Sequence, residues 1–124
     1  MRVSRASLTT LLQRNVVEIK FMRRRPKKGA PPTRRMLCTS DMKLLTSPQG
    51  RIALNFRAAY KMQKYDLNQK DLVLAWDIFM QDYRLISMNA CELISTIPTV
   101  GFWKFFNTRL ALMTTRTKID FMNR

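Results

Sequence analysis

The sequence predicts a small, helix-dominated α+β single domain. We expect helices in its C-terminal part, a short two-stranded sheet, and an extended basic, proline-rich arm. Three observations support this prediction. The longest apolar-periodic run, residues 71–98, has helical spacing. Residues 16–22 alternate apolar and polar side chains, as a half-buried strand does. Residues 23–35 are rich in arginine, lysine and proline and cannot pack into a core.

The run over residues 71–98 is the centre of the predicted fold. Its large apolar side chains follow one another at spacings of four and three, which places them along one stripe of an α-helix. Asp77 and Arg84 lie on the opposite, polar stripe, and Pro98 ends the segment. Residues 87–89 leave open whether the segment forms one helix or two. The predicted core stripe comprises Leu72, Trp76, Phe79, Tyr83, Ile86, Ala90, Leu93 and Ile97.

Composition and charge narrow the class of protein. The 124 residues suffice for one domain with a modest core, and a hydrophobic fraction of 46% is ordinary for a folded chain. Twenty-three Lys and Arg oppose eight Asp and Glu, and a formal net charge of +15 favours a polyanionic partner. Eleven of the cations, and Glu18 alone among the acids, fall within residues 1–37. We therefore divide the chain into a basic N-terminal arm (1–37) and a compact globular domain (38–124).

The first fifteen residues combine three arginines, several hydroxyl side chains and no acid. This composition is typical of a mitochondrial transit peptide and, equally, of a short amphipathic helix that groups Leu8, Leu11 and Leu12. Residues 16–22 follow as a short strand of β-branched and aromatic side chains. Because a single strand cannot stand alone, it needs a pairing partner.

The segment 51–65 is ambiguous between strand and helix. Apolar residues alternate from Ile52 to Ala58, which favours a strand, whereas Ala58 and Ala59 together favour a helix. We favour a strand over its first seven residues, which would pair with the strand of residues 16–22. Before it, Ser40 or Asp41 caps a brief helix, and the sequence Ser-Pro-Gln-Gly that ends at residue 50 forms a turn.

Four aromatic residues within positions 102–106 give the C-terminal part a large apolar area. In a helix the three phenylalanines face inward, whereas Trp103 points elsewhere and either covers the edge of the core or lies exposed as a contact residue. Exposed tryptophans are frequent interface anchors, so Trp103 is the predicted partner-binding residue. A last helix, capped by Thr114 or Thr115, packs back onto the aromatic cluster.

The segment 23–35 gives the strongest functional signal in the sequence. Its seven cations and three prolines suit phosphate binding, a nuclear import signal or contact with anionic lipid, and a solubilising loop is the alternative. Cations also interleave with tyrosines within residues 57–65, a combination that holds single-stranded nucleic acid, although half-buried tyrosines rimmed by solvated lysines explain it equally. The predicted nucleic-acid contacts are Arg23, Arg24, Arg25, Lys27, Lys28, Arg34, Arg35, Arg57, Lys61 and Lys64.

The sequence lacks the residues that several kinds of catalytic and metal-binding site require. Histidine is absent, which removes the Ser-His and Cys-His nucleophile pairs. Cys38 and Cys91 are too few for a disulfide scaffold or a zinc cluster, and free thiols indicate a reducing, intracellular compartment. Asp77 and Asp82 would point apart on a helix and would not share a metal. No phosphate-cradling glycine motif occurs, and no apolar run approaches the roughly twenty residues of a membrane span. We expect no enzymatic activity, no metal and no cofactor.

The favoured function is a non-enzymatic nucleic-acid-binding protein, with RNA favoured, of the ribonucleoprotein or nucleocapsid-subunit type. The alternative class is a protein-interaction adaptor or inhibitor, such as a viral accessory or matrix-like protein, that uses the aromatic surface around Trp103. The arm would then be a nuclear address or a contact to an anionic membrane. Self-association through an unpaired strand edge fits either class, and both nucleus and mitochondrion fit the intracellular assignment.

Overall fold

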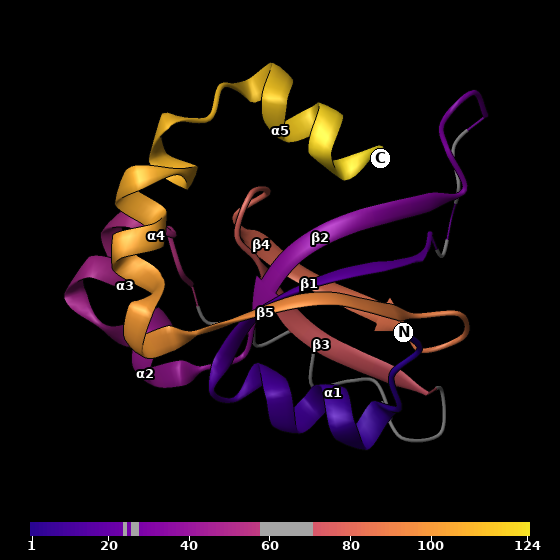
Figure 1. Ribbon diagram of the computed structural model, residues 1–124, viewed down its shortest axis with the longest axis horizontal. Helices are drawn as coiled ribbons and strands as arrows, with labels where there is room; N and C mark the ends of the chain where they lie inside the picture. The colour runs from indigo at the N-terminus through magenta and orange to yellow at the C-terminus, as the bar shows by residue number, and fades with distance from the viewer. Residues whose placement is uncertain (24, 26–27, 58–70) are drawn as a thin grey trace.

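The computed structural model describes residues 1–23, 25, 28–57 and 71–124 (Figure 1). Its centre is a five-stranded antiparallel sheet with the strand order β4-β3-β2-β1-β5. The strands are β1 (Asn15–Met22), β2 (Thr33–Thr39), β3 (Leu72–Asp77), β4 (Asp82–Ser87) and β5 (Glu92–Pro98). Around them lie α1 (Arg5–Leu12), α2 (Met42–Thr46), α3 (Pro48–Ala53), α4 (Phe102–Thr108) and α5 (Thr115–Met122), with two 3-10 turns, η2 (Thr99–Gly101) and η3 (Leu110–Leu112).

The prediction of a helix-dominated fold is wrong, because the run 71–98 forms β3, β4 and β5 instead of a helix. β3 lies inside the sheet and is buried on both faces, so its residues do not alternate apolar with polar. Two tight turns then reverse the chain, and they need backbone in the left-handed region, at Gln81 (φ 54°) and Ala90 (φ 64°). The Asp77 carboxylate fixes the first turn by accepting the N–H groups of Phe79 and Met80.

The short two-stranded sheet is also a wrong prediction, although the strand over residues 16–22 is confirmed as β1. β1 pairs with β2 and β5, not with residues 51–57. Ser47 accepts the N–H of Gly50 and caps α3, with Pro48 in its first turn. The predicted turn that ends at residue 50 is therefore the start of this helix, and residues 51–53 of the predicted strand belong to the same helix. The rest of the ambiguous segment, residues 58–65, lies outside the described residues.

The predicted local helix signals are found where the sequence placed them. Asp41 caps α2 through the N–H groups of Lys43 and Leu44, and Thr114 caps α5 through the N–H of Thr117. α1 corresponds to the amphipathic first helix, and α4 to the predicted aromatic helix. These caps are contacts between near neighbours in the chain, so the sequence determines them without help from the fold.

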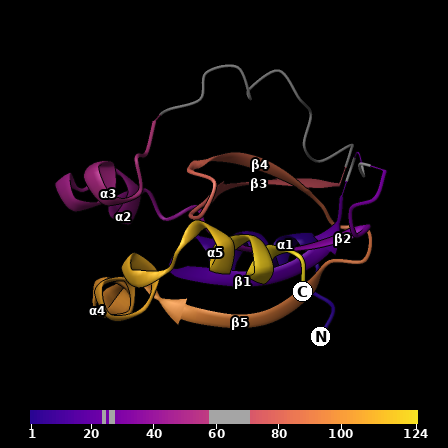
Figure 2. The same ribbon diagram turned by 90° about the horizontal axis from the view of Figure 1, so that it is seen from above.

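The sheet is strongly curved. Figure 2 shows the β3–β4 hairpin lying over β1, β2 and β5 as a second layer. Figures 1 and 2 place α1 along one margin of this folded sheet and α5 along the opposite margin. A first core packs the leucines of α1 against side chains from β1, β2, β3 and β4. Its buried members are Leu8, Leu12, Val17, Ile19, Phe21, Met36, Cys38, Val73, Ala75, Ile86, Met88 and Cys91.

A second core fills the end of the sheet where α2, α3 and α4 gather. Trp76 is at its centre: the side chain is 1% exposed, and its indole N–H donates to the carbonyl oxygen of Leu54 at 3.1 Å. Phe56 and Tyr83 approach its ring edge to face, at centroid distances of 5.0 and 5.1 Å. Phe102 of α4 is buried in the same cluster. This core therefore holds α2, α3 and α4 beside one another.

The two thiols of the first core are expected to be unreactive in the folded protein. Burial raises the pKa of Cys38 well above its usual range, and burial together with Glu92 raises the pKa of Cys91 from its usual value near 9 to about 11. At about pH 8 iodoacetamide should label both thiols in denaturant and neither in buffer, because only the thiolate reacts. Labelling of the folded protein at the denatured rate would contradict this burial. Stability should also fall as pH rises from about 9 to about 11, since the unfolded chain releases these protons first.

Candidate nucleic-acid interface

Of the predicted arm (residues 1–37), residues 5–12 form α1 and the described residues from 15 on belong to the β1–β2 hairpin, whose loop projects from the body of the molecule (Figure 1). We call the loop over residues 23–32 the basic tip. Its sequence has five cations and no acid, and of these cations the structure describes Arg23, Arg25 and Lys28. Arg25 and Lys28 are exposed, which leaves both charges available to a partner.

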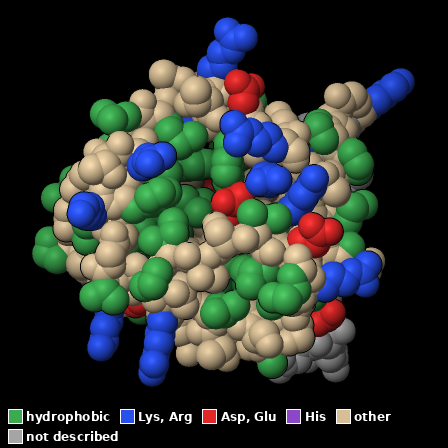
Figure 3. Space-filling model, in the orientation of Figure 1, with side chains coloured by type: hydrophobic (Ala, Val, Ile, Leu, Met, Phe, Trp, Pro, Cys, Tyr) green, Lys and Arg blue, Asp and Glu red, His purple; other side chains and the backbone are tan. Residues whose placement is uncertain are grey.

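Arg23 anchors the base of the basic tip. Its guanidinium donates to the carbonyl oxygen of Pro31 and to Oδ1 of Asn123, both at 3.1 Å, and its backbone N–H donates to the Pro32 carbonyl oxygen. Partial burial and the nearby Arg34 guanidinium lower the pKa of Arg23. The contact with Asn123 brings the end of α5 beside the hairpin. Figure 3 shows Lys and Arg side chains gathered over this part of the surface.

The remaining predicted cations of the hairpin lie in its strands and have acidic partners. Arg34 is 8% exposed; its guanidinium forms an ion pair with Asp77 and lies 3.4 Å from Sδ of Met122. Arg35 pairs with Glu18 at 2.9 Å. Sequence alone gave no sign of either pairing, because both partners are distant in the chain. These two arginines hold the sheet and α5 together instead of extending the basic tip.

The other predicted contacts are not brought to the basic tip within the described residues. Arg57 is exposed and follows α3, in a different part of the chain from the hairpin. Arg24, Lys27, Lys61 and Lys64 lie outside the described residues.

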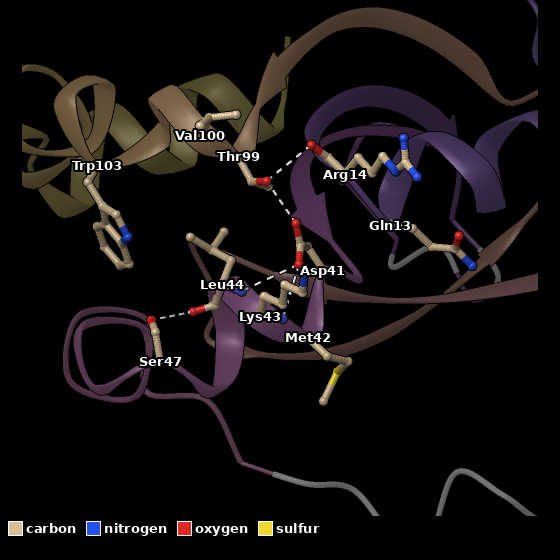
Figure 4. A pocket seen from close by; sticks show the side chains of 10 residues that line it. All are labelled: Gln13, Arg14, Asp41, Met42, Lys43, Leu44, Ser47, Thr99, Val100 and Trp103. Atoms are coloured by element: carbon tan, nitrogen blue, oxygen red, sulfur yellow. Dashed lines mark hydrogen bonds between the residues drawn. The ribbon is translucent and has the colours of Figure 1, made fainter.

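Trp103 lies on α4 at one side of an open groove of about 730 Å³, which we call the Trp103 groove. Figure 4 shows the indole directed from α4 toward Ser47, with Gln13 and Arg14 on the far side and Lys43 between them. Trp103 is half-buried, and its ring meets Phe102 and Phe106 at centroid distances of 5.2 and 5.5 Å. The lining comes from three separate segments: the end of α1, the region of α2 and the η2–α4 turn.

Hydrogen bonds hold these three segments together. The backbone N–H of Thr99 donates to the carbonyl oxygen of Arg14 at 3.1 Å, and the Thr99 hydroxyl donates its single proton to the carboxylate of Asp41. The same hydroxyl lies 2.7 Å from Oδ2 of Asp41, whose other oxygen caps α2 (Figure 4). The acid of the groove is therefore fully engaged with protein donors. Arg14 and Lys43 are exposed and form no ion pair with any described residue, so the free charge of the groove is positive.

A second hollow, of about 480 Å³, lies between α4, α5 and the adjoining strands. Phe105, Phe121 and Met113 line it, together with Ile97 and Leu37 from the sheet. Figure 3 shows hydrophobic side chains gathered there. Most of this lining is apolar, and its charged members are Arg109 and Glu18, of which Glu18 is paired with Arg35.

The described residues offer few groups for catalysis or metal binding. No three His, Cys, Asp or Glu side chains among them lie close enough to hold a metal ion. Asp77 and Asp82 face one another across β3 and β4, but Asp77 is engaged by Arg34 and the turn that follows it. No helix in the described part of the chain is long and apolar enough to cross a membrane. Comparison with protein-family models, curated proteins and solved structures finds no match to this chain.

Proposed function

We propose that this protein binds nucleic acid without catalysing a reaction, and that the basic tip supplies most of the affinity through contacts to phosphates. RNA is the favoured partner. The observation that supports the proposal is a projecting hairpin loop with exposed Arg25 and Lys28 and no acid in its sequence. Each phosphate neutralised by such a cation releases counterions, which favours binding and makes it dependent on salt.

The basic tip suits a regular array of phosphates better than a single acidic group. Arg25 and Lys28 are exposed and lie three positions apart in the basic tip, and Arg23 is fixed at its base by Pro31 and Asn123. Phosphate contacts of this kind position a protein on nucleic acid but do not read its sequence. We therefore expect affinity with little sequence specificity from this part of the molecule.

Replacing Arg25 and Lys28 with glutamine should weaken binding to an unstructured RNA and reduce its salt dependence. Each lost phosphate contact lowers the slope of log affinity against log salt by about 0.7 for a single strand. The double variant should therefore reduce this slope by up to about 1.4. Fluorescence anisotropy of a labelled RNA over a salt series measures it.

The matched control replaces Arg2 and Arg116, two exposed cations outside the hairpin, with glutamine. It removes the same charge and should change the slope much less. Equal slopes for the two double variants would show that net charge alone causes binding, and would contradict a role for the basic tip. No binding of the unaltered protein to RNA or DNA at low salt would contradict the proposed function itself.

A protein-interaction adaptor is the second candidate function. Val100 and Met42 line the Trp103 groove and are 97% and 51% exposed, an apolar rim of the type that interfaces cover. In this case Trp103→Ala would abolish capture of a protein partner and leave nucleic-acid affinity nearly unchanged.

A further inference from the structure

The Trp103 groove combines one aromatic side chain with two cations that form no ion pair among the residues that the structure describes. That aromatic side chain, Trp103, differs from Trp76, the other tryptophan of the chain, in burial and in hydrogen bonding. Trp76 is fully enclosed and satisfies its indole N–H on Leu54, whereas Trp103 is half-buried and its N–H donates to no acceptor within the described residues. Buried tryptophans usually find such a partner. The indole of Trp103 therefore keeps both apolar surface and a hydrogen-bond donor available to a ligand.

The indole is also held in place before any ligand arrives. Edge-to-face contacts with Phe102 and Phe106 surround it, and Phe102 is fully buried in the second core. An aromatic ring that is fixed in advance loses little conformational entropy when a second ring stacks on it.

Charge indicates which partner fits the groove. Asp41, the one acid among the described residues of its lining, accepts hydrogen bonds from two α2 N–H groups and from Thr99. Lys43 and Arg14 form no ion pair with any described residue, and Figure 4 shows Lys43 between Trp103 and Arg14, with the Arg14 guanidinium extending to the far side of the groove. An aromatic platform followed by two cations matches one unpaired base and the phosphates next to it.

We propose that the Trp103 groove binds single-stranded RNA, with one unstacked base on the Trp103 indole and the neighbouring phosphates on Lys43 and Arg14. This inference rests on the proposed nucleic-acid-binding function and adds the preference for single strands. A base within a duplex is stacked on both sides and cannot reach the indole. The groove therefore discriminates by strand state, which the basic tip cannot do.

The groove and the basic tip are separate contact regions. Arg14 and Arg23 flank the two ends of β1, whose 8 residues span about 26 Å at roughly 3.3 Å per residue. Figure 1 shows α2 and α4 at the opposite end of the molecule from the hairpin loop. The two regions can therefore be altered independently, and their contributions to affinity can be separated by mutation.

The test measures the affinity of the full chain for an unstructured RNA and for the same sequence in a duplex, by fluorescence anisotropy. Trp103→Leu should weaken binding of the single strand by about 5- to 150-fold, the usual loss for one stacked base, and leave duplex binding unchanged. Trp103→Phe keeps an aromatic ring and should recover much of the affinity. The single strand should also quench tryptophan fluorescence in the unaltered protein, because Trp103 is accessible and Trp76 is not.

A second variant covers the case in which Trp103→Leu does not fold. Arg14→Gln with Lys43→Gln leaves the aromatic cluster intact and should weaken single-strand binding more than duplex binding. Single-strand affinity that is unchanged in the folded variants, or that falls equally with duplex affinity, would overturn this inference. The same RNA titrated against Arg25→Gln/Lys28→Gln would still test the proposed function. Failure of the unaltered protein to bind either RNA would overturn both.

Discussion

Replacing Arg34 with alanine is expected to lower the free energy of unfolding by about 3–5 kcal/mol, the usual cost of leaving one partner of a buried ion pair alone. The Asp77 side chain is 1% exposed and the Arg34 side chain 10%, so the substitution would leave the Asp77 carboxyl group buried without its partner. Asp77 also fixes the β3–β4 turn by accepting the N–H groups of Phe79 and Met80, so its carboxyl group would stay in place without Arg34. Equilibrium urea unfolding followed by circular dichroism measures the change.

Two further variants distinguish an unpaired charge from a simple loss of packing. Asp77→Asn keeps an acceptor for the turn and removes the charge, so Arg34→Ala/Asp77→Asn should be more stable than Arg34→Ala alone. Arg35→Ala is the matched control: the pair of Arg35 with Glu18 is more exposed, at 27% and 16%, and its loss should cost about 1 kcal/mol. Equal losses for Arg34→Ala and Arg35→Ala would contradict the assignment of a buried, structurally essential pair.

Because Arg34 is buried in an ion pair, it cannot be grouped with the exposed cations in a binding experiment. Arg34 belongs to the same basic stretch as Arg25 and Lys28, and sequence alone assigns it the same role. A variant that neutralised the whole stretch would destabilise the sheet at the same time as it removed the binding cations. Loss of RNA binding in such a variant would therefore say nothing about phosphate contacts. The structure limits the informative substitutions to the exposed cations of the basic tip.

The parts of the fold that depend on near neighbours could be predicted from the sequence. β1 alternates because one of its faces meets α1, and Asp41 and Thr114 cap their helices over two or three residues. β3, β4 and β5 could not be predicted, because β3 is covered on both faces and shows no alternation. The apolar residues of three successive strands then fell by coincidence at helical spacing. The turns at Gln81 and Ala90 separate the three observed strands from the single predicted helix. Neither residue is a typical turn former, so the sequence did not signal these turns.

The candidate interface also has one part that could be predicted from the sequence and one part that could not. The charge of the basic tip is contiguous in sequence, so composition alone could single it out. The Trp103 groove combines three segments that meet only because β1 and β5 are neighbours and Thr99 binds Arg14 and Asp41. Sequence could single out Trp103 as an aromatic residue off the helix face. It carried no signal that Arg14 or Lys43 would lie beside it, since that proximity depends on the strand order.

Gly50→Ala is expected to destabilise the protein, against the general trend. In a helix interior alanine is more favourable than glycine by about 0.5–1 kcal/mol. At Gly50, however, a Cβ atom would collide with the carbonyl oxygen of Leu44 and lie 2.9 Å from that of Leu45. Both are backbone atoms and cannot rotate away, so α2 and α3 must separate. We expect a loss of about 1–3 kcal/mol or more in the free energy of unfolding, measured by urea titration.

Gly101→Ala is the matched control, because no atom lies within 4 Å of the added Cβ and its φ is −101°. It should change stability by less than about 1 kcal/mol. Both glycines flank the Trp103 groove, Gly50 beside Ser47 and Gly101 beside Val100, so the pair also tests what the groove requires. If the α2–α3 junction shapes the groove, Gly50→Ala protein that remains folded should bind single-stranded RNA more weakly than Gly101→Ala protein. Equal stability of the two variants would contradict the close packing of α3 on α2, and with it the fixed geometry that the groove needs to hold a base.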